Sequence, residues 1–156
     1  MARECSVAKA LEVVGERWAL LALREVFLGV WRFDAIQAAT GAPRAVLVRR
    51  LRTLVEAGVL WRCDYRDGGS RTRQEYRLTA AGRELQPVLT ALMQWGDRHL
   101  PGPDGPPLRL THSGCDAPVR AALYCTAGHH LDDTGRDLTA TPARPTAKPE
   151  FDGEFR

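Results

Sequence analysis

Apolar residues recur with a helical period along most of the first hundred positions. In residues 6–14 they return at three- and four-residue spacing until Gly15 ends the run. Residues 16–28 are apolar on nearly all sides, which predicts a buried central helix. A short helix is expected over residues 33–39 and a longer one over residues 43–57.

The join between these last two helices has the composition of a tight turn. Gly41 can adopt a positive φ, and Pro43 suits the first turn of a helix. A short helix, a glycine-containing turn and a longer helix form the pattern of a helix-turn-helix.

The expected helix over residues 43–57 has two different faces. One arc of the helix is apolar and predicts its buried face: Leu47, Val48, Leu51, Leu54 and Val55. The other face has arginines and small side chains, as a helix in the major groove requires. Near base edges we expect Arg44, Ala45, Val46 and Arg49, and at phosphates Arg50 and Arg52. The alternative is an amphipathic helix whose arginine face is simply solvated.

A β-hairpin is predicted after this helix. Residues 59–65 and 74–78 alternate apolar and polar positions, and the segment between them is polar and contains glycine. A basic hairpin beside a helix-turn-helix is a wing that can reach the DNA backbone. We expect Arg71 and Arg73 to make those contacts, with Arg66 a weaker candidate.

The last long helix is expected over residues 80–100. Thr79 would cap it, and Pro87 would kink it or mark where its regular part begins. Its broad apolar stripe has little intramolecular surface left to cover it, so we expect the helix to form a homodimer. The alternative is that the stripe packs back on its own domain.

The charge distribution favours a polyanionic partner, although the formal net charge is only +3. Nine arginines lie within residues 43–77 against four acidic residues. No apolar run is long enough for a membrane span, and the first residues have no signal-peptide pattern, so a cytoplasmic protein is expected. No membrane contact is expected.

The fold class predicted from these patterns is α+β, mostly α: a winged helix-turn-helix with a long C-terminal dimerisation helix and a small C-terminal extension. The winged helix and dimerisation domain is expected over residues 1–100. A Pro/Gly-rich linker would follow at 101–108, a small Cys/His-containing extension at 109–138, and a disordered tail at 139–156.

Cysteine and histidine in the extension have a spacing that could hold zinc. The candidate ligands are His112, Cys115, Cys125 and either His129 or His130. The alternative is a hairpin held by apolar contacts, without metal. Binding of double-stranded DNA requires no cofactor in either case.

Several motifs in order resemble the HxlR-type winged helix-turn-helix regulators. They include Val14-Gly-Glu-Arg-Trp18, Leu51-Arg-Thr-Leu-Val-Glu-Ala-Gly-Val59, Glu75-Tyr-Arg-Leu-Thr-Ala-Ala-Gly82 and Trp95-Gly96, and the resemblance extends over residues 5–99. It implies a homodimeric bacterial transcriptional regulator that binds a palindromic operator. It also implies release by an oxidant, an electrophile or a small metabolite.

The resemblance implies a sensor thiol at Cys5, which directly precedes a helix; a helix N-terminus favours the reactive thiolate. The alternative is a small structural cysteine. Whether an effector pocket lies near Trp18 or Trp95 is a question that the sequence does not decide. No general base with an orienting partner and no nucleotide-binding loop is present, so an enzyme is not expected. The competing function is a winged-helix protein-interaction module that meets an acidic partner.

Overall fold

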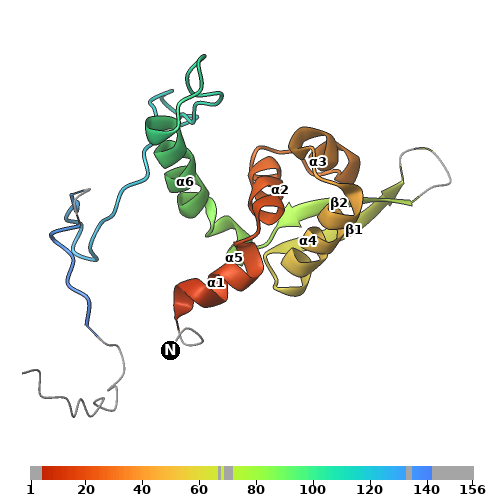
Figure 1. Cartoon of the computed structure of the whole chain (residues 1–156), viewed down its shortest axis with the longest axis horizontal. Helices are drawn as coiled ribbons and strands as arrows, with labels where there is room; N and C mark the ends of the chain where they lie inside the picture. The colour runs from red at the N-terminus through yellow and green to blue at the C-terminus, as the bar shows by residue number, and fades with distance from the viewer. Residues whose placement is uncertain (1–4, 67, 69–71, 133–134, 142–156) are drawn as a thin grey trace, which may run out of the picture. The chain divides into compact units, whose positions relative to one another are not determined.

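The computed structural model describes residues 5–66, 68, 72–132 and 135–141 (Figure 1). The chain divides into two compact units, residues 1–121 and residues 122–156. The first unit contains every helix and strand of the described residues (Figure 1). No helix among the described residues is long and apolar enough to cross a membrane.

Four helices build the first half of this unit. They are α1 (Ser6–Val14), α2 (Arg17–Phe27), α3 (Phe33–Thr40) and α4 (Arg44–Glu56). α2 lies at the centre and packs against both α3 and α4, as the apolar character of its sequence predicts. The largest fully buried side chains come from these helices and the strand that follows: Leu23, Ile36, Leu47, Leu51, Leu54 and Leu60.

The turn between α3 and α4 has the predicted chemistry. Gly41 ends α3 with φ of 69°, a left-handed conformation that glycine adopts without strain. The Thr40 hydroxyl donates to the Ile36 carbonyl at 2.7 Å and accepts from the Ala42 amide at 3.3 Å. Ala42 is buried, and Pro43 is the N-cap of α4. These contacts set the angle at which α4 leaves α3, so the helix-turn-helix is confirmed.

The wing is an antiparallel hairpin of β1 (Leu60–Arg66) and β2 (Thr72–Leu78). The register pairs Leu60 with Leu78 at the base and Arg66 with Thr72 near the tip. A short extended segment before α3 joins this sheet, because the Tyr76 amide donates to the Trp31 carbonyl at 2.8 Å. The fold is therefore a winged helix-turn-helix, mostly α with a small sheet, as expected.

A close backbone approach holds the base of the wing. The Thr79 hydroxyl donates to the Gly58 carbonyl at 2.6 Å and accepts from the Gly82 amide at 3.0 Å. A Cβ at Gly82 would lie 2.1 Å from the Val59 carbonyl oxygen, so no larger residue fits there without a shift. Gly82, the last residue of the Thr79-Ala-Ala-Gly82 run, therefore allows the backbone to pack closely against Val59.

The expected single helix over residues 80–100 is two helices. α5 (Ala80–Arg83) ends in a turn, and α6 (Gln86–His99) begins there with Pro87 in its first turn. Proline is tolerated there because the first amides of a helix lack intrahelical partners. Of the two predicted roles, Pro87 marks where the regular helix starts.

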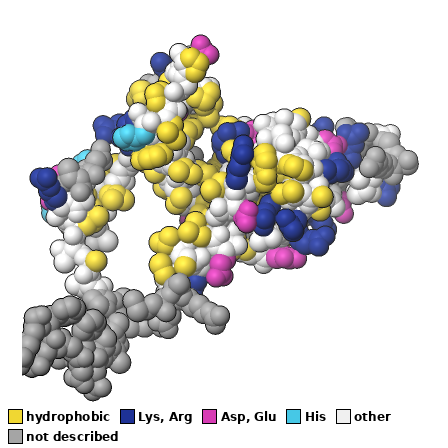
Figure 2. All heavy atoms as spheres, in the orientation of Figure 1, with side chains coloured by type: hydrophobic (Ala, Val, Ile, Leu, Met, Phe, Trp, Pro, Cys, Tyr) yellow, Lys and Arg dark blue, Asp and Glu magenta, His cyan; other side chains and the backbone are white. Residues whose placement is uncertain are grey.

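Apolar side chains remain exposed on two helices of this unit. On α6 the exposed fractions of Val88, Leu92 and Trp95 are 54%, 51% and 51%, and on α1 those of Val7 and Leu11 are 65% and 54%. Figure 2 shows hydrophobic side chains gathered over both helices. We call these residues the α1/α6 apolar surface.

The unit continues beyond α6 to residue 121. Gln94 of α6 donates to the Val119 carbonyl at 2.8 Å and accepts from the Ala121 amide at 3.0 Å. The division at residue 121 falls within the extension expected over 109–138. Most of the tail expected to be disordered, residues 142–156, lies outside the described residues.

Two turns occur among the described residues of the second unit, one within residues 123–131 and one at residues 135–138, where the Leu138 amide donates to the Gly135 carbonyl at 3.2 Å. The Leu131 amide donates to the Leu123 carbonyl at 2.9 Å, and the Cys125 amide donates to the His129 carbonyl at 3.0 Å. The rings of Tyr124 and His130 meet edge to face with centroids 5.2 Å apart. 

Candidate nucleic-acid interface

The buried face of α4 is narrower than its apolar pattern predicts. Leu47, Leu51 and Leu54 are fully buried and Val55 is half-buried, but Val48 is 40% exposed. The expectation that Val48 belongs to the core is therefore wrong. It lies one turn after Arg44 and one turn before Arg52, on the side of α4 that faces the wing.

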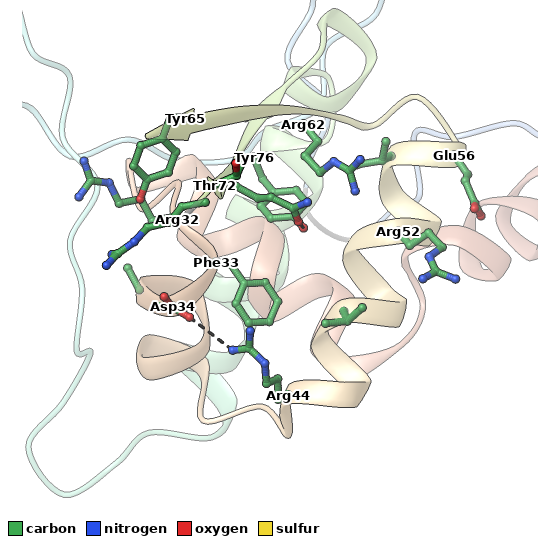
Figure 3. Close-up of a pocket in the computed structure, with 15 residues that line it drawn as sticks. Arg32, Phe33, Asp34, Arg44, Arg52, Glu56, Arg62, Tyr65, Thr72 and Tyr76 are labelled. Atoms are coloured by element: carbon green, nitrogen blue, oxygen red, sulfur yellow. Dashed lines mark hydrogen bonds and ion pairs between the residues drawn. The ribbon is translucent and has the colours of Figure 1, made fainter. Parts of the chain in front are cut away.

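A concavity of about 1000 Å³ lies between α4, the start of α3 and the wing (Figure 3). Ten labelled side chains in Figure 3 show how these three elements surround it. Its charged lining residues are five arginines and two acids: Arg32, Arg44, Arg52, Arg62, Arg73, Asp34 and Glu56. Such an excess of positive charge in a hollow concentrates field lines and favours an anionic partner.

Arg44 occupies the entrance formed by α3 and α4. Its guanidinium carbon lies 4.6 Å from the centre of the Phe33 ring, and Nη1 lies 3.4 Å from Asp34 Oδ1 (Figure 3). Both charged side chains are mostly exposed, 60% and 71%. An exposed pair of this kind contributes little to stability, so a phosphate could replace Asp34 as the partner.

Arg52, Arg62 and Arg73 approach the same hollow from α4, β1 and β2. No ion pair to them is present among the described residues. Their guanidinium groups therefore remain available for bidentate contacts to an anion.

The hollow has an uncharged aromatic floor. Tyr76 is buried and donates its hydroxyl to Gln74 Oε1 at 3.1 Å. Burial raises the pKa of Tyr76 above the ordinary value, an effect that the nearby Arg62 charge opposes and the Asp64 charge reinforces. The phenol therefore stays neutral and adds no negative charge to the site.

Arg32 and Arg62 were not among the residues predicted to contact DNA. Arg32 precedes α3, where its guanidinium lies 4.8 Å from the Tyr65 ring centre and Nε lies 3.5 Å from Glu75 Oε1. It is far in sequence from the arginine-rich segment, and only the sheet contact with β2 brings it to the hollow. The position of Arg62 could have been predicted from strand alternation. Residues two apart on a strand lie on the same face, so Arg62 shares the face of the buried Leu60.

Arg50, expected at a phosphate, is directed elsewhere. Its Nη2 lies 3.1 Å from Glu16 Oε2 at the start of α2, and its side chain is only 21% exposed. Its Nε is buried without a hydrogen-bond partner. The structure thus gives Arg50 a contact between helices, away from the concavity.

The remaining predicted DNA contacts lie in three environments. Ala45 and Arg49 are exposed on the outer face of α4 but do not line the hollow, and Val46 is half-buried. Arg73 lines the hollow, whereas Arg71 lies outside the described residues.

The candidate sensor and zinc residues lie outside this interface. Cys5 is the exposed N-cap residue of α1, and its side chain makes no capping hydrogen bond. His112 Nδ1 lies 3.3 Å from Cys115 Sγ, and Cys125 Sγ lies 3.5 Å from His129 Nδ1. A structural zinc site needs four ligands, whereas each of these pairs has two, and no group of three or more potential ligands occurs among the described residues.

The sequence from the end of α1 to the segment after α6 matches a family model. The match covers residues 13–103, and the model is described as HxlR-like helix-turn-helix. The chain belongs to the HxlR family. This HxlR-family protein is 46% identical to an uncharacterised helix-turn-helix transcriptional regulator of Mycobacterium tuberculosis, over 94% of this chain and 87% of the relative.

Solved structures agree with this assignment. The candidate transcription factor PA1607 is 34% identical, with a TM-score of 0.74 over 88% of this chain and 96% of the other. The redox regulator HypR in its reduced form is 25% identical, with a TM-score of 0.54 over 62% of this chain and 96% of the other. The HxlR-family protein is thus a transcriptional regulator of the helix-turn-helix type.

Proposed function

We propose that this regulator binds double-stranded DNA with α4 and the arginine-lined concavity, as a homodimer on a palindromic operator. The observation that supports this most is the meeting of five arginines from the residue before α3, from α4 and from the wing around one hollow. A duplex has two charges per base-pair step, and arginine forks match phosphate and guanine geometry.

The exposed face of α4 determines how DNA would meet this surface. Arg44 lies in the first turn, where recognition helices touch base edges, and Ala45 and Arg49 are exposed beside it. Arg52 is two turns later, next to Arg62 of the wing in the lining of the hollow. The early residues would therefore specify sequence, and the later ones would hold the phosphate backbone.

The α1/α6 apolar surface supports the homodimer. Val7 and Leu11 on one helix and Val88 and Trp95 on the other are all at least half exposed. Exposed apolar side chains contiguous along a helix mark interaction sites. A two-fold axis through α6 would space two copies of α4 for the half-sites of an inverted repeat.

Selection of DNA from a random pool by the full chain tests the proposal. An enriched inverted repeat with half-sites about one helical turn apart is expected. Affinity should fall steeply with salt, with a log–log slope of about −0.9 for each phosphate contacted. If folded, dimeric protein enriches no sequence and binds DNA without salt dependence, the winged-helix protein-interaction module becomes the better explanation.

Control by oxidants or electrophiles is the regulatory part of the proposal. HypR is a redox regulator, and in this chain the Cys5 thiol is exposed at the start of α1. A thiolate there would face the positive end of the helix dipole. Oxidation should release the wild-type protein from its operator and leave Cys5→Ser bound; equal release of both proteins would remove Cys5 as the sensor.

A further inference from the structure

A second hollow, of about 330 Å³, lies between α2 and α6 in the first unit. Its walls are mostly apolar, formed chiefly by Leu20, Leu21, Phe27, Leu89, Met93 and Leu110. Small-molecule pockets in proteins measure about 300–1000 Å³, so this one suits a compact ligand. The sequence by itself allowed an effector pocket near Trp18 or Trp95, but neither residue lines this one.

Polar groups in this pocket are few and specific. Thr90 is only 7% exposed, and within the described residues its side chain makes no hydrogen bond. Gln86 lies one turn before it on α6 and also lines the pocket. The Thr90 hydroxyl can therefore donate a hydrogen bond to an acceptor group on a ligand.

The wall formed by α2 contains one guanidinium group. Arg24 of α2 lines the pocket and is ion-paired with Glu25, which is 6% exposed. The ion pair balances the charge of the guanidinium, whose remaining N–H groups can donate hydrogen bonds to an acceptor on a ligand. Asp97 also lines the pocket, and it disfavours a second anionic group.

The pocket lies between α2, which supports the proposed recognition helix α4, and α6, the proposed dimerisation helix. α2 packs directly against α4, and α6 contributes Val88 and Trp95 to the α1/α6 apolar surface. A molecule between α2 and α6 would therefore change how the recognition helices are spaced in a dimer.

We infer that this pocket binds a compact, mostly apolar molecule with one hydrogen-bond-accepting group, and that its occupancy changes operator affinity. The second half of this inference rests on the proposed function. A partner subunit that inserts into the pocket is the competing occupant, and the experiment separates the two.

The test uses the full-length protein and the anionic aromatic probe 1-anilinonaphthalene-8-sulfonate. Saturable binding of one probe per protomer is expected in a fluorescence titration. Gly96→Leu should weaken it at least tenfold, because a Cβ at this pocket-lining glycine meets nothing within 4 Å and the added side chain has room to fill the pocket. Ala39→Leu, at an exposed position of α3 outside the pocket, is the matched control and should bind the probe like wild type.

Thr90→Val is a second variant that keeps the shape of the pocket. Loss of the hydroxyl should weaken probe binding about threefold to tenfold, the usual range for one hydrogen bond. Equal probe affinity in wild type, Gly96→Leu and Thr90→Val would overturn the pocket. A second combination of results would also overturn it: the wild-type dimer binds no probe, and Gly96→Leu changes the oligomeric state measured by light scattering. The partner subunit would then be the occupant of the hollow.

Operator affinity with and without saturating probe tests the regulatory half. A change of at least fivefold is expected, at the lower end of common coupling between sites. An unchanged operator affinity would overturn the coupling and leave the pocket. If no operator can be selected at all, the proposed function fails, while the comparison of Gly96→Leu with Ala39→Leu still decides the pocket.

Discussion

The concavity beside α4 and the pocket between α2 and α6 belong to one compact unit and share no lining residue. Five arginines line the first, whereas half of the residues that line the second are leucines. Charge in an open hollow acts over a long range on an anion, while an apolar pocket selects by shape and desolvation at contact. The two proposed activities, DNA binding and small-molecule binding, would therefore use separate surfaces of the unit.

The largest effect is expected from reversing charge in the concavity. The double variant Arg44→Glu/Arg52→Glu should lower operator affinity about a hundredfold or more, because each lost contact costs roughly 1–3 kcal/mol. Fluorescence anisotropy with the selected operator measures this. The control is Arg98→Glu/Arg109→Glu, exposed positions outside both hollows with the same change in charge. Equal losses in the two double variants would mean that only net charge matters.

The next effect concerns the α1/α6 apolar surface, which we propose as the dimer interface. Trp95→Ala should raise the homodimer dissociation constant about thirtyfold, because buried tryptophans at interfaces commonly contribute 2 kcal/mol or more. Sedimentation over a range of concentrations measures it. Trp61→Ala is the matched control, since Trp61 on the wing is 48% exposed and Trp95 is 51% exposed. A dimer unaffected by Trp95→Ala would exclude this part of α6 from the interface.

A smaller effect is expected on stability when the apolar pocket is filled. Gly96→Leu should stabilise the fold by up to about 1 kcal/mol, because glycine is a poor helix former and leucine a good one. The melting temperature in circular dichroism should rise by a few degrees, and the Ala39→Leu control should stay near wild type. A fall of several degrees would show that the new side chain collides with a neighbour.

The smallest effect is expected from removal of metal. Treatment with EDTA should change operator affinity less than about twofold, since neither hollow is lined by His112, Cys115, Cys125 or His129. The zinc content of protein purified without a histidine tag should be measured alongside. Near one equivalent of zinc would show that the protein binds the metal, and a large loss of DNA binding with EDTA would make the zinc structural for the regulator.

Local chemistry made much of the fold predictable. The Gly41 turn, the central apolar helix and the alternation in the wing each depend on residues close in sequence. The kinds of side chain at the concavity were predictable too, because Arg44, Arg52 and Arg73 follow directly from helix and hairpin patterns. These features need only backbone geometry and the period of the apolar residues.

Other features depend on neighbours that the local pattern does not specify. Val48 has the apolar character of a core residue, yet it is exposed because no element of the described part of the chain covers that side of α4. Arg50 has the character of a DNA contact, yet Glu16 of another helix holds it. Pro87 allowed two outcomes, and the turn after α5 decided between them.

By itself the sequence determined a winged helix-turn-helix with a strongly basic half, because helix period, turn glycines and arginine density are local properties. Only the tertiary structure decided that Arg32 and Arg62 join Arg44 around one hollow, and that α2 and α6 leave a pocket beside Thr90. The physical reason is that a concavity belongs to the space between elements. Its lining depends on how their faces are turned toward each other, which no single segment contains.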